Sequence, residues 1–315
     1  MSEKIPLIVI CGPTASGKTS LGIELAKHIG GEIISADSMQ IYKGMDIATA
    51  KPTAEEMCEV PHHLISIIDP DTEFSVADYL TLAREKITEI YSRGKMPIVV
   101  GGTGLYISSL VDNISFENAY TDGSVRKKLT DEAEKIGREA MLDRLREIDP
   151  ETAEGLHANN ITRIIRALEI YELTGMKFSE HKTVSRMNES PYKVCMVGLD
   201  FTDRNVLYDR INQRVDIMAE QGLVEEARAV YESGHKMKTA YQAIGYKELI
   251  PYFDGEKTLD ECLDFLKMQT RRYAKRQLTW FRRDERIVWI KLDEILNKRK
   301  IIMDCLNIVE NSEIM

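Results

Sequence analysis

The 315-residue chain lacks several features that would restrict what kind of protein it is. No apolar run approaches the roughly 20 residues that a membrane-spanning helix needs. The apolar stretch from Ile5 to Cys11 is short and leads directly into glycines, so we interpret it as a buried strand rather than a signal peptide. The five cysteines form no CxxC pair, which argues against a disulfide framework and a zinc site. We therefore expect a cytoplasmic protein that does not bind membranes.

Positive charge is also scarce, because 42 lysines and arginines face 51 aspartates and glutamates and the net charge is -9. This balance argues weakly against a nucleic-acid partner, but a total can hide a local patch. One segment is strongly basic, and its charged residues are Arg271, Arg272, Lys275, Arg276, Arg282, Arg283 and Arg286. By itself, the segment is better explained as a solvated helix face than as a nucleic-acid surface.

Strands and helices alternate through the first hundred residues and again near the C-terminus. The expected strands are Leu7–Cys11, Glu32–Ala36, Met96–Val100, Lys193–Leu199 and Ile287–Ile290, and the expected helices include Lys18–Ile29, Val76–Arg93, one after Asp203 and Thr258–Arg283. Continuous apolar runs are typical of parallel strands that are covered on both faces. The pattern predicts a doubly wound α/β protein, with a P-loop-type parallel sheet as its core.

The middle of the chain follows a different pattern, with helix after helix from about Asn118 to Lys182 and a capped amphipathic helix beginning near Asn160. We interpret residues 116–189 as an all-helical insertion into a discontinuous core of residues 1–115 and 190–295. Residues 296–315 are expected to form an exposed helix or a frayed tail.

A glycine-rich loop follows the first strand. Its residues Gly12, Pro13, Thr14, Ala15, Ser16, Gly17, Lys18 and Thr19 match G-x-x-x-x-G-K-[ST] in full. Backbone N–H groups in such a loop turn inward around an anion, and the N-terminus of the next helix adds positive potential. Lys18 can neutralise phosphate oxygens, and the Thr19 hydroxyl can bind Mg²⁺. The loop predicts a phosphate ligand but no particular reaction.

Two further segments end strands of the expected sheet. Asp37 follows the second strand, and Thr103 lies in a Gly-Gly-Thr-Gly turn after the third. Ligands of open α/β sheets bind at those ends. Asp37 is therefore a candidate general base or magnesium partner, with a turn or cap aspartate as an equal alternative. His62 and His63 have no partners at metal spacing, so we assign them a structural role.

Taken together, these motifs closely resemble bacterial tRNA dimethylallyltransferases, also called tRNA isopentenyltransferases. The matching motifs are GPTASGKT at 12–19, SADS at 35–38, IYKGMDI at 41–47, TAKP at 49–52, PHHL at 61–64, VGGTGLY at 100–106 and AKRQLTWFR at 274–282. The similarity is collinear from about residue 5 to residue 290. The phosphate loop alone is unspecific, whereas the whole series is highly specific.

The resemblance implies transfer of a dimethylallyl group from dimethylallyl diphosphate to the N6 amine of the adenosine just 3′ of the anticodon. It implies Asp37 as general base, Thr103 as an active-site residue and an arginine on the diphosphate, for which we favour Arg214 over Arg210. It also implies Mg²⁺ on Thr19. The residues that it places on the tRNA anticodon stem-loop are Asp37, Ser38, Met39, Gln40, Thr103, Arg126, Thr162, Arg163, Ile164, Ile165, Arg166, Gln242, Gly245, Tyr246, Lys247 and Arg276.

The chemistry of this reaction fits the residue types. Charge builds on the leaving diphosphate, which a phosphate loop, Lys18, Mg²⁺ and an arginine are suited to stabilise. The adenine must leave its stack to reach a buried donor, which costs least in a single-stranded loop. Alternatives are a small-molecule kinase, a nucleotide-gated RNA-binding protein and a prenyltransferase acting on free AMP. The long insertion argues against the last, because a mononucleotide needs no such platform. We expect a monomer.

Overall fold

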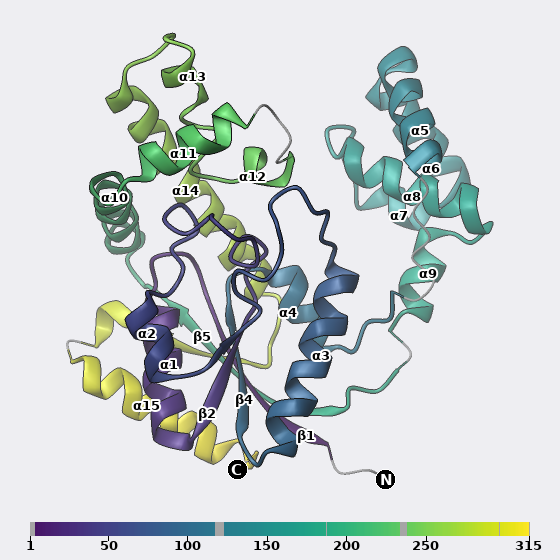
Figure 1. The fold of residues 1–315 in the computed structure, drawn as a ribbon. Coiled ribbons are helices and arrows are strands. Elements are labelled where there is room, and N and C mark those ends of the chain that lie inside the picture. Colours follow the sequence, from purple (N-terminus) through teal and green to yellow (C-terminus); the bar gives the residue numbers. More distant parts are fainter. Residues whose placement is uncertain (1–3, 117–122, 187, 234–237, 296, 315) are drawn as a thin grey trace. The chain divides into compact units, whose positions relative to one another are not determined.

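The computed structural model describes residues 4–116, 123–186, 188–233, 238–295 and 297–314. It divides into two compact units (Figure 1). Unit 1 comprises Met1–Val111 and Pro191–Met315, and unit 2 comprises Asp112–Ser190. Over the described residues, no helix is both long enough and apolar enough to cross a membrane.

Unit 1 is built on a six-stranded sheet in the order β3-β2-β4-β1-β5-β6. The strands are β1 (Ile5–Cys11), β2 (Gly31–Ser35), β3 (His62–His63), β4 (Met96–Gly101), β5 (Tyr192–Asp200) and β6 (Ile287–Lys291). All neighbouring pairs are parallel, so the α/β fold predicted from the sequence is confirmed. Central β1 has its last five residues buried, as its apolar run requires. The short edge strand β3 was missed because only two residues pair.

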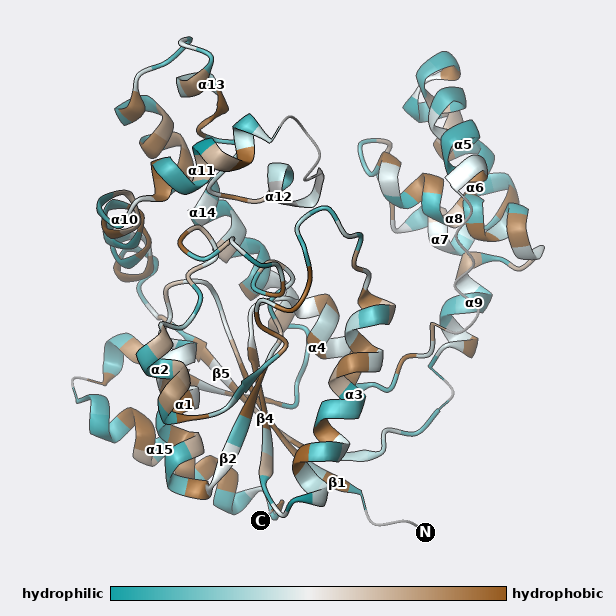
Figure 2. Cartoon of the chain, viewed as in Figure 1, coloured by the Kyte–Doolittle hydropathy of each residue, from teal (hydrophilic) through white to brown (hydrophobic). Residues whose placement is uncertain are grey.

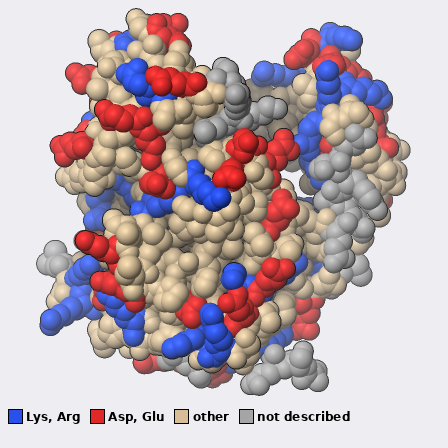
Figure 3. Space-filling model, in the orientation of Figure 1, with Lys and Arg blue, Asp and Glu red and all other residues tan. Residues whose placement is uncertain are grey.

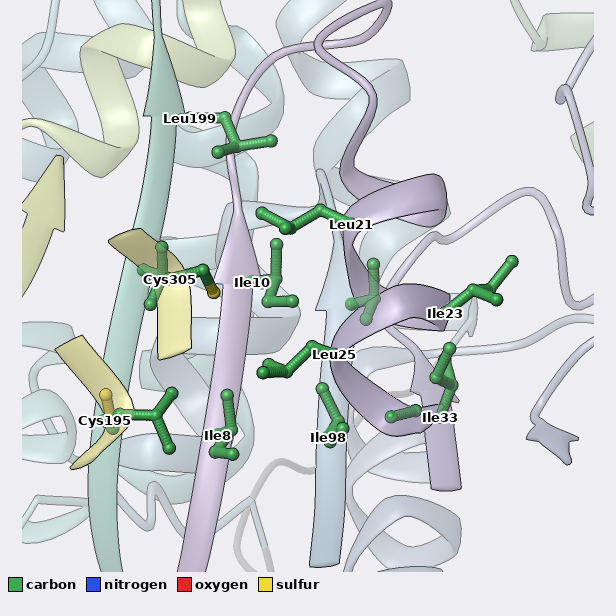
Figure 4. Packing of buried hydrophobic residues seen from close by; sticks show 14 of the residues in the cluster. Ile8, Ile10, Leu21, Ile23, Leu25, Ile33, Ile98, Cys195, Leu199 and Cys305 are labelled. Carbon is green, nitrogen blue, oxygen red and sulfur yellow. The ribbon is translucent and has the colours of Figure 1, made fainter. Parts of the chain in front are cut away.

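Helices cover both faces of this sheet (Figure 1). On one face lie α1 (Lys18–Ile29) and α15 (Lys298–Asn311), and on the other lie α3 (Val76–Ser92) and α4 (Gly104–Val111). Figure 4 shows the core under α1, where Leu21 and Leu25 pack against Ile8 and Ile10 of β1. Figure 2 shows apolar residues concentrated along the strands and on the helix faces turned toward them.

Helix α15 corrects the prediction of an exposed or frayed C-terminal tail. Its residues Cys305 and Val309 are fully buried in the same core as β1 and α1, and burial raises the pKa of the Cys305 thiol to about 12. Apolar residues spaced four apart carried the signal for a packed helix. The prediction failed because it relied on the general tendency of chain ends to be exposed or frayed.

A group of helices stands at the carboxyl ends of the strands. It comprises α10 (Arg204–Glu220), α11 (Leu223–Glu232), α12 (Lys238–Gln242), α13 (Ile250–Phe253) and α14 (Leu259–Phe281). The helix expected after Asp203 is α10, and the Asp203 side chain caps it. Thr258 caps α14 in a reciprocal capping box. The short helix α2 (Ala54–Glu59) and a 3₁₀ turn (Leu292–Glu294) complete unit 1. Ile41, Tyr42 and Met45 pack under these helices and fix the polar loop that follows.

Unit 2 is all-helical where it is described. Its helices are α5 (Gly123–Ile136), α6 (Arg138–Ile148), α7 (Pro150–Glu154), α8 (Ile161–Thr174) and α9 (Phe178–Val184). A core of its own, centred on Leu129, Met141, Leu145, Ile164 and Leu168, holds them together. Gly175 ends α8 in the left-handed conformation, as its position after the apolar stripe predicted.

The buried carboxylate of Asp200 at the end of β5 leads to a stability prediction. Its oxygens accept from Arg204 at 3.1 Å and from Arg282 and Lys291 at 2.7 Å each. Burial acts to raise the pKa of Asp200, but these cations hold it below its usual value.

Replacing Asp200 with asparagine should destabilise unit 1 by about 2–3 kcal/mol, because three cations would lose their counter-charge. The cost stays moderate because the three cations are partly exposed to water. Urea unfolding at pH 7 measures the change. A variant within about 0.5 kcal/mol of wild type would show that the ion cluster is energetically neutral.

Candidate active site

The phosphate loop has the backbone geometry that its glycines predict. Gly12 has φ +146°, and a Cβ there would lie 2.7 Å from the carbonyl oxygen of Leu199 on neighbouring β5. Gly17 lies in the left-handed region at φ +86° and precedes the first residue of α1. The Lys18 Nζ donates to the carbonyl oxygen of Pro13 at 2.6 Å, so the side chain folds back over the loop. The loop is thus preformed around an anion site.

Two cations lie close together beside this loop. Burial and the nearby Arg214 guanidinium lower the pKa of Lys18 to about 8, against the opposing effect of Asp37. Burial also lowers the pKa of Arg214, which Asp37 raises and Arg210 lowers. The Arg210 Nε donates to the carbonyl oxygen of Ala15 at 2.9 Å and so supports the loop from outside. Because burial disfavours the charged forms of Lys18 and Arg214, an anionic ligand bound beside them would stabilise both charges.

The segment after β2 and the turn after β4 are joined by hydrogen bonds. The Asp37 carboxylate accepts from the backbone N–H of Met39 at 2.9 Å. The Thr103 hydroxyl accepts from the backbone N–H of Ser38 at 3.0 Å, and its own N–H donates to the Ala36 carbonyl at 3.1 Å. Asp37 is therefore held in a fixed turn at the edge of the sheet where the phosphate loop also lies.

Helix α14 contributes residues to which the sequence analysis gave no role. The Gln277 amide accepts from the backbone N–H of Thr14 at 2.8 Å and donates to the Gly102 carbonyl at 3.0 Å, so it joins the phosphate loop to the glycine turn. Burial and the Asp37 carboxylate raise the pKa of Tyr273 well above its usual value. Gly104 must be glycine, because a Cβ there would lie 2.3 Å from the Trp280 ring. No local pattern signals contacts of such long sequence separation.

One cavity of about 1060 Å³ collects these parts within unit 1. Its polar lining includes Lys18, Thr19, Asp37, Arg214, Tyr273, Arg276 and Gln277, and its apolar lining includes Ile211, Val215, Met218, Leu223 and Leu266. An anion cradle, a carboxylate and an apolar wall therefore share one space. Such a cavity suits a ligand with a charged end and an apolar end.

Comparison with known proteins decides the family. Residues 40–284 match the family model described as IPP transferase. This chain belongs to that family. The relatives include the tRNA dimethylallyltransferase of Acetivibrio thermocellus, 52% identical over 297 residues, which covers 94% of this chain and 95% of the relative. That of Halalkalibacterium halodurans is 49% identical over 302 residues, covering 96% and 95%.

Solved structures of IPP transferases agree in fold. The full-length tRNA isopentenylpyrophosphate transferase of Bacillus halodurans has a TM-score of 0.73 at 47% identity, covering 98% of this chain and 97% of that one. A eukaryotic dimethylallyltransferase acting on tRNA has a TM-score of 0.81 at 29% identity, covering 98% and 80%. The resemblance inferred from the sequence is therefore confirmed, as is the enzyme class, a tRNA prenyltransferase.

Most of the predicted tRNA-contacting residues of unit 1 surround the cavity of this IPP transferase. Ser38, Met39, Gln40, Gln242, Gly245, Lys247 and Arg276 line it. Gln40 is also a structural link, because its amide donates to the carbonyls of Thr49 and Ala50 at 3.2 and 3.3 Å. Tyr246 is buried instead, with its hydroxyl donating to Glu226 at 2.8 Å.

In unit 2, the predicted tRNA surface is only partly exposed. Thr162 and Arg163 are exposed at the start of α8, and Figure 3 shows many lysines and arginines over this unit. Arg126 and Arg166 donate to one buried carboxylate, Glu169, at 2.8 and 2.6 Å. The prediction for Ile164 is wrong, because its side chain is fully buried in the core of the unit. Ile165 is 8% exposed and packs in the same core, which corrects its assignment to the surface as well.

The cavity of unit 1 offers a metal ion few protein ligands. Among the described residues, no group of three or more His, Cys, Asp or Glu side chains could hold one. Thr19 and Asp37 line the same cavity and offer oxygen atoms, which Mg²⁺ prefers. Ser16 Oγ is buried and has no hydrogen-bond partner in the described part of the chain. This donor set fits Mg²⁺ held by one or two protein oxygens and by the phosphates of a substrate.

Proposed function

We propose that this chain transfers a dimethylallyl group from dimethylallyl diphosphate to the N6 amine of tRNA adenosine 37, just 3′ of the anticodon, and releases diphosphate. The observation that carries the proposal is the single cavity in which Asp37 faces the same space as Lys18 and Arg214, with an apolar wall beside them. A kinase has no need of such a wall, and an RNA-binding module has no need of the carboxylate.

In this reaction, the bond between the dimethylallyl carbon and the diphosphate oxygen breaks as the N6–carbon bond forms. The Asp37 carboxylate takes the proton from N6, which raises the nucleophilicity of an amine whose lone pair is delocalised into the ring. The phosphate loop, Lys18 and Arg214 hold the charge that builds on the diphosphate. Mg²⁺, when bound at Thr19, adds positive charge at the same phosphates.

The tRNA side of the proposal rests on arginines and on the cavity. Arg126, Arg163 and Arg166 of unit 2 hold the phosphates of the anticodon stem-loop despite the negative net charge. Arg276 does the same beside the cavity, where its guanidinium lies 5.7 Å from the Tyr273 ring. The adenosine leaves its stack to enter the cavity. We further propose that the protein acts as a monomer in the cytosol.

Incubation with isoprenoid-labelled dimethylallyl diphosphate, Mg²⁺ and unmodified tRNA tests the function. We expect label in the tRNA, at the adenosine 3′ of the anticodon after nuclease digestion. Free AMP in place of tRNA should stay unlabelled. Transfer of the γ-phosphoryl of labelled ATP to a small molecule, without tRNA labelling, would contradict the proposal and favour a kinase.

The lowered pKa of Lys18 predicts a pH dependence for donor binding. The amine is charged below about pH 8 and neutral above it, whereas the phosphates of the donor are fully ionised throughout that range. Affinity for dimethylallyl diphosphate in the absence of tRNA should therefore fall as the pH rises through about 8 to 9. Calorimetric titration from pH 7 to 9.5 measures it, with a Lys18→Met variant as the flat reference. A wild-type affinity that does not change with pH would contradict this role for Lys18.

A further inference from the structure

The polar loop that forms one wall of the cavity is fastened by a carboxylate from a distant helix. The Glu226 side chain on α11 accepts from the backbone N–H groups of Asp46 and Ile47 at 2.8 Å each and of Ala48 at 2.9 Å. A fourth hydrogen bond, at 2.8 Å, comes from the Tyr246 hydroxyl. Three consecutive N–H groups that converge on one carboxylate form a strong, charge-assisted anchor.

The rest of the loop depends on this anchor. Residues 46–53 all line the cavity. Ala48 packs tightly against the turn after α12, where a Cβ added at Gly245 would lie 2.8 Å from the Ala48 Cβ. Lys51 fastens the far end of the loop through the Asp46 carboxylate at 2.6 Å and the Ser66 hydroxyl at 2.8 Å. Among these contacts, the three hydrogen bonds to Glu226 tie the backbone of residues 46–48 to α11, whereas the Lys51 contacts stay within residues 46–66.

From the loop, a chain of hydrogen bonds leads to the segment that carries Asp37. The Gln40 amide donates to the carbonyls of Thr49 and Ala50 and accepts from the Ser35 hydroxyl at 3.0 Å. Asp37 lies between Ser35 and Gln40. The phosphate loop is held differently, through Gln277 and Arg210. Loosening residues 46–50 therefore disturbs the carboxylate side of the cavity while leaving the phosphate side in place.

We propose that Glu226 is a positioning residue, which holds the loop at 46–50 so that the acceptor adenine meets Asp37 in the correct orientation. Glu226 does not line the cavity, so it acts through the loop rather than on the substrates. The inference rests on the proposed transfer to tRNA. Misplacing a reacting group by about 1 Å costs on the order of 100-fold in rate, so the loss of four hydrogen bonds here has a measurable effect.

Glu226→Ala and Glu226→Gln test the proposal, with Glu225→Ala as the matched control. Glu225 is the exposed neighbour on the same helix. We expect Glu226→Ala to lower kcat/KM for tRNA at least tenfold while KM for dimethylallyl diphosphate stays within about threefold. Glu226→Gln keeps one acceptor oxygen, so its kcat/KM for tRNA should lie between those of wild type and Glu226→Ala. Glu225→Ala should match wild type.

Hydrogen exchange separates positioning from a general loss of structure. In Glu226→Ala, amide exchange should accelerate over residues 45–50 and stay unchanged in β1, α1 and the phosphate loop. Exchange that rises throughout unit 1, or a donor KM that rises in parallel with the loss of turnover, would overturn the proposal. If Glu226→Ala does not fold, the kinetic and hydrogen-exchange measurements are made on Glu226→Gln instead. If the wild-type protein transfers nothing to tRNA, the proposed function fails, and unchanged exchange at residues 45–50 would separately refute the anchor.

Discussion

Replacement of Asp37 with asparagine should lower the rate of transfer to tRNA by about 10²–10⁴-fold, the usual contribution of a general base. Asparagine is nearly isosteric and keeps an oxygen that can accept from the Met39 N–H, so the turn after β2 should persist. What it loses is the ability to take a proton from the N6 amine. Single-turnover transfer of labelled isoprenoid, with tRNA and donor both saturating, measures the chemical step directly.

Binding measurements give this prediction its control. Affinities of the Asp37→Asn variant for tRNA and for dimethylallyl diphosphate should stay within a few-fold of wild type, since the arginines and the phosphate loop are unchanged. Asp69→Asn, at an exposed residue paired with Lys43, should have full activity. If the Asp37 variant retained turnover within a few-fold of wild type, the assignment of the base would be wrong.

Replacement of Lys18 with methionine should lower kcat by about 10²–10³-fold, which is typical for the loss of one preorganised donor to developing charge. Donor affinity should fall as well, because the phosphates lose a cation. The fold should not suffer, since the burial that lowers the Lys18 pKa shows that the charge is held at a cost. Steady-state kinetics and thermal unfolding without ligand measure the two effects.

A lysine on the same helix provides the comparison for that experiment. Lys27 lies in the last turn of α1 and pairs with Glu24 and Glu59 at the surface. Lys27→Met should leave turnover unchanged. A Lys18→Met variant that kept its kcat but lost only donor affinity would show that the amine binds the ground state and does not stabilise the leaving group.

The fold could be predicted largely because its elements are encoded locally. The apolar run of β1, the stripe of α3 and the capping aspartate of α10 are each local features of one element, and the structure confirms all three. The same logic was not applied to α15, whose apolar residues at helical spacing pack in the core although the helix lies at the end of the chain. For Ile164 it was the family resemblance that failed, because similarity to a family transfers positions without showing which way a side chain of α8 points.

Of the candidate site, the sequence by itself determined the phosphate loop, because glycine spacing and the strand-to-helix context fix that backbone within eight residues. It also placed Asp37 and the Thr103 turn at the carboxyl ends of strands, since parallel strands end at one edge. Only the tertiary structure decided that Gln277 bonds to Thr14 across 263 residues and that Glu226 anchors Ala48 across 178. Such contacts depend on how helices pack over the sheet. A linear pattern records the period of each helix, but not which groups its side chains meet.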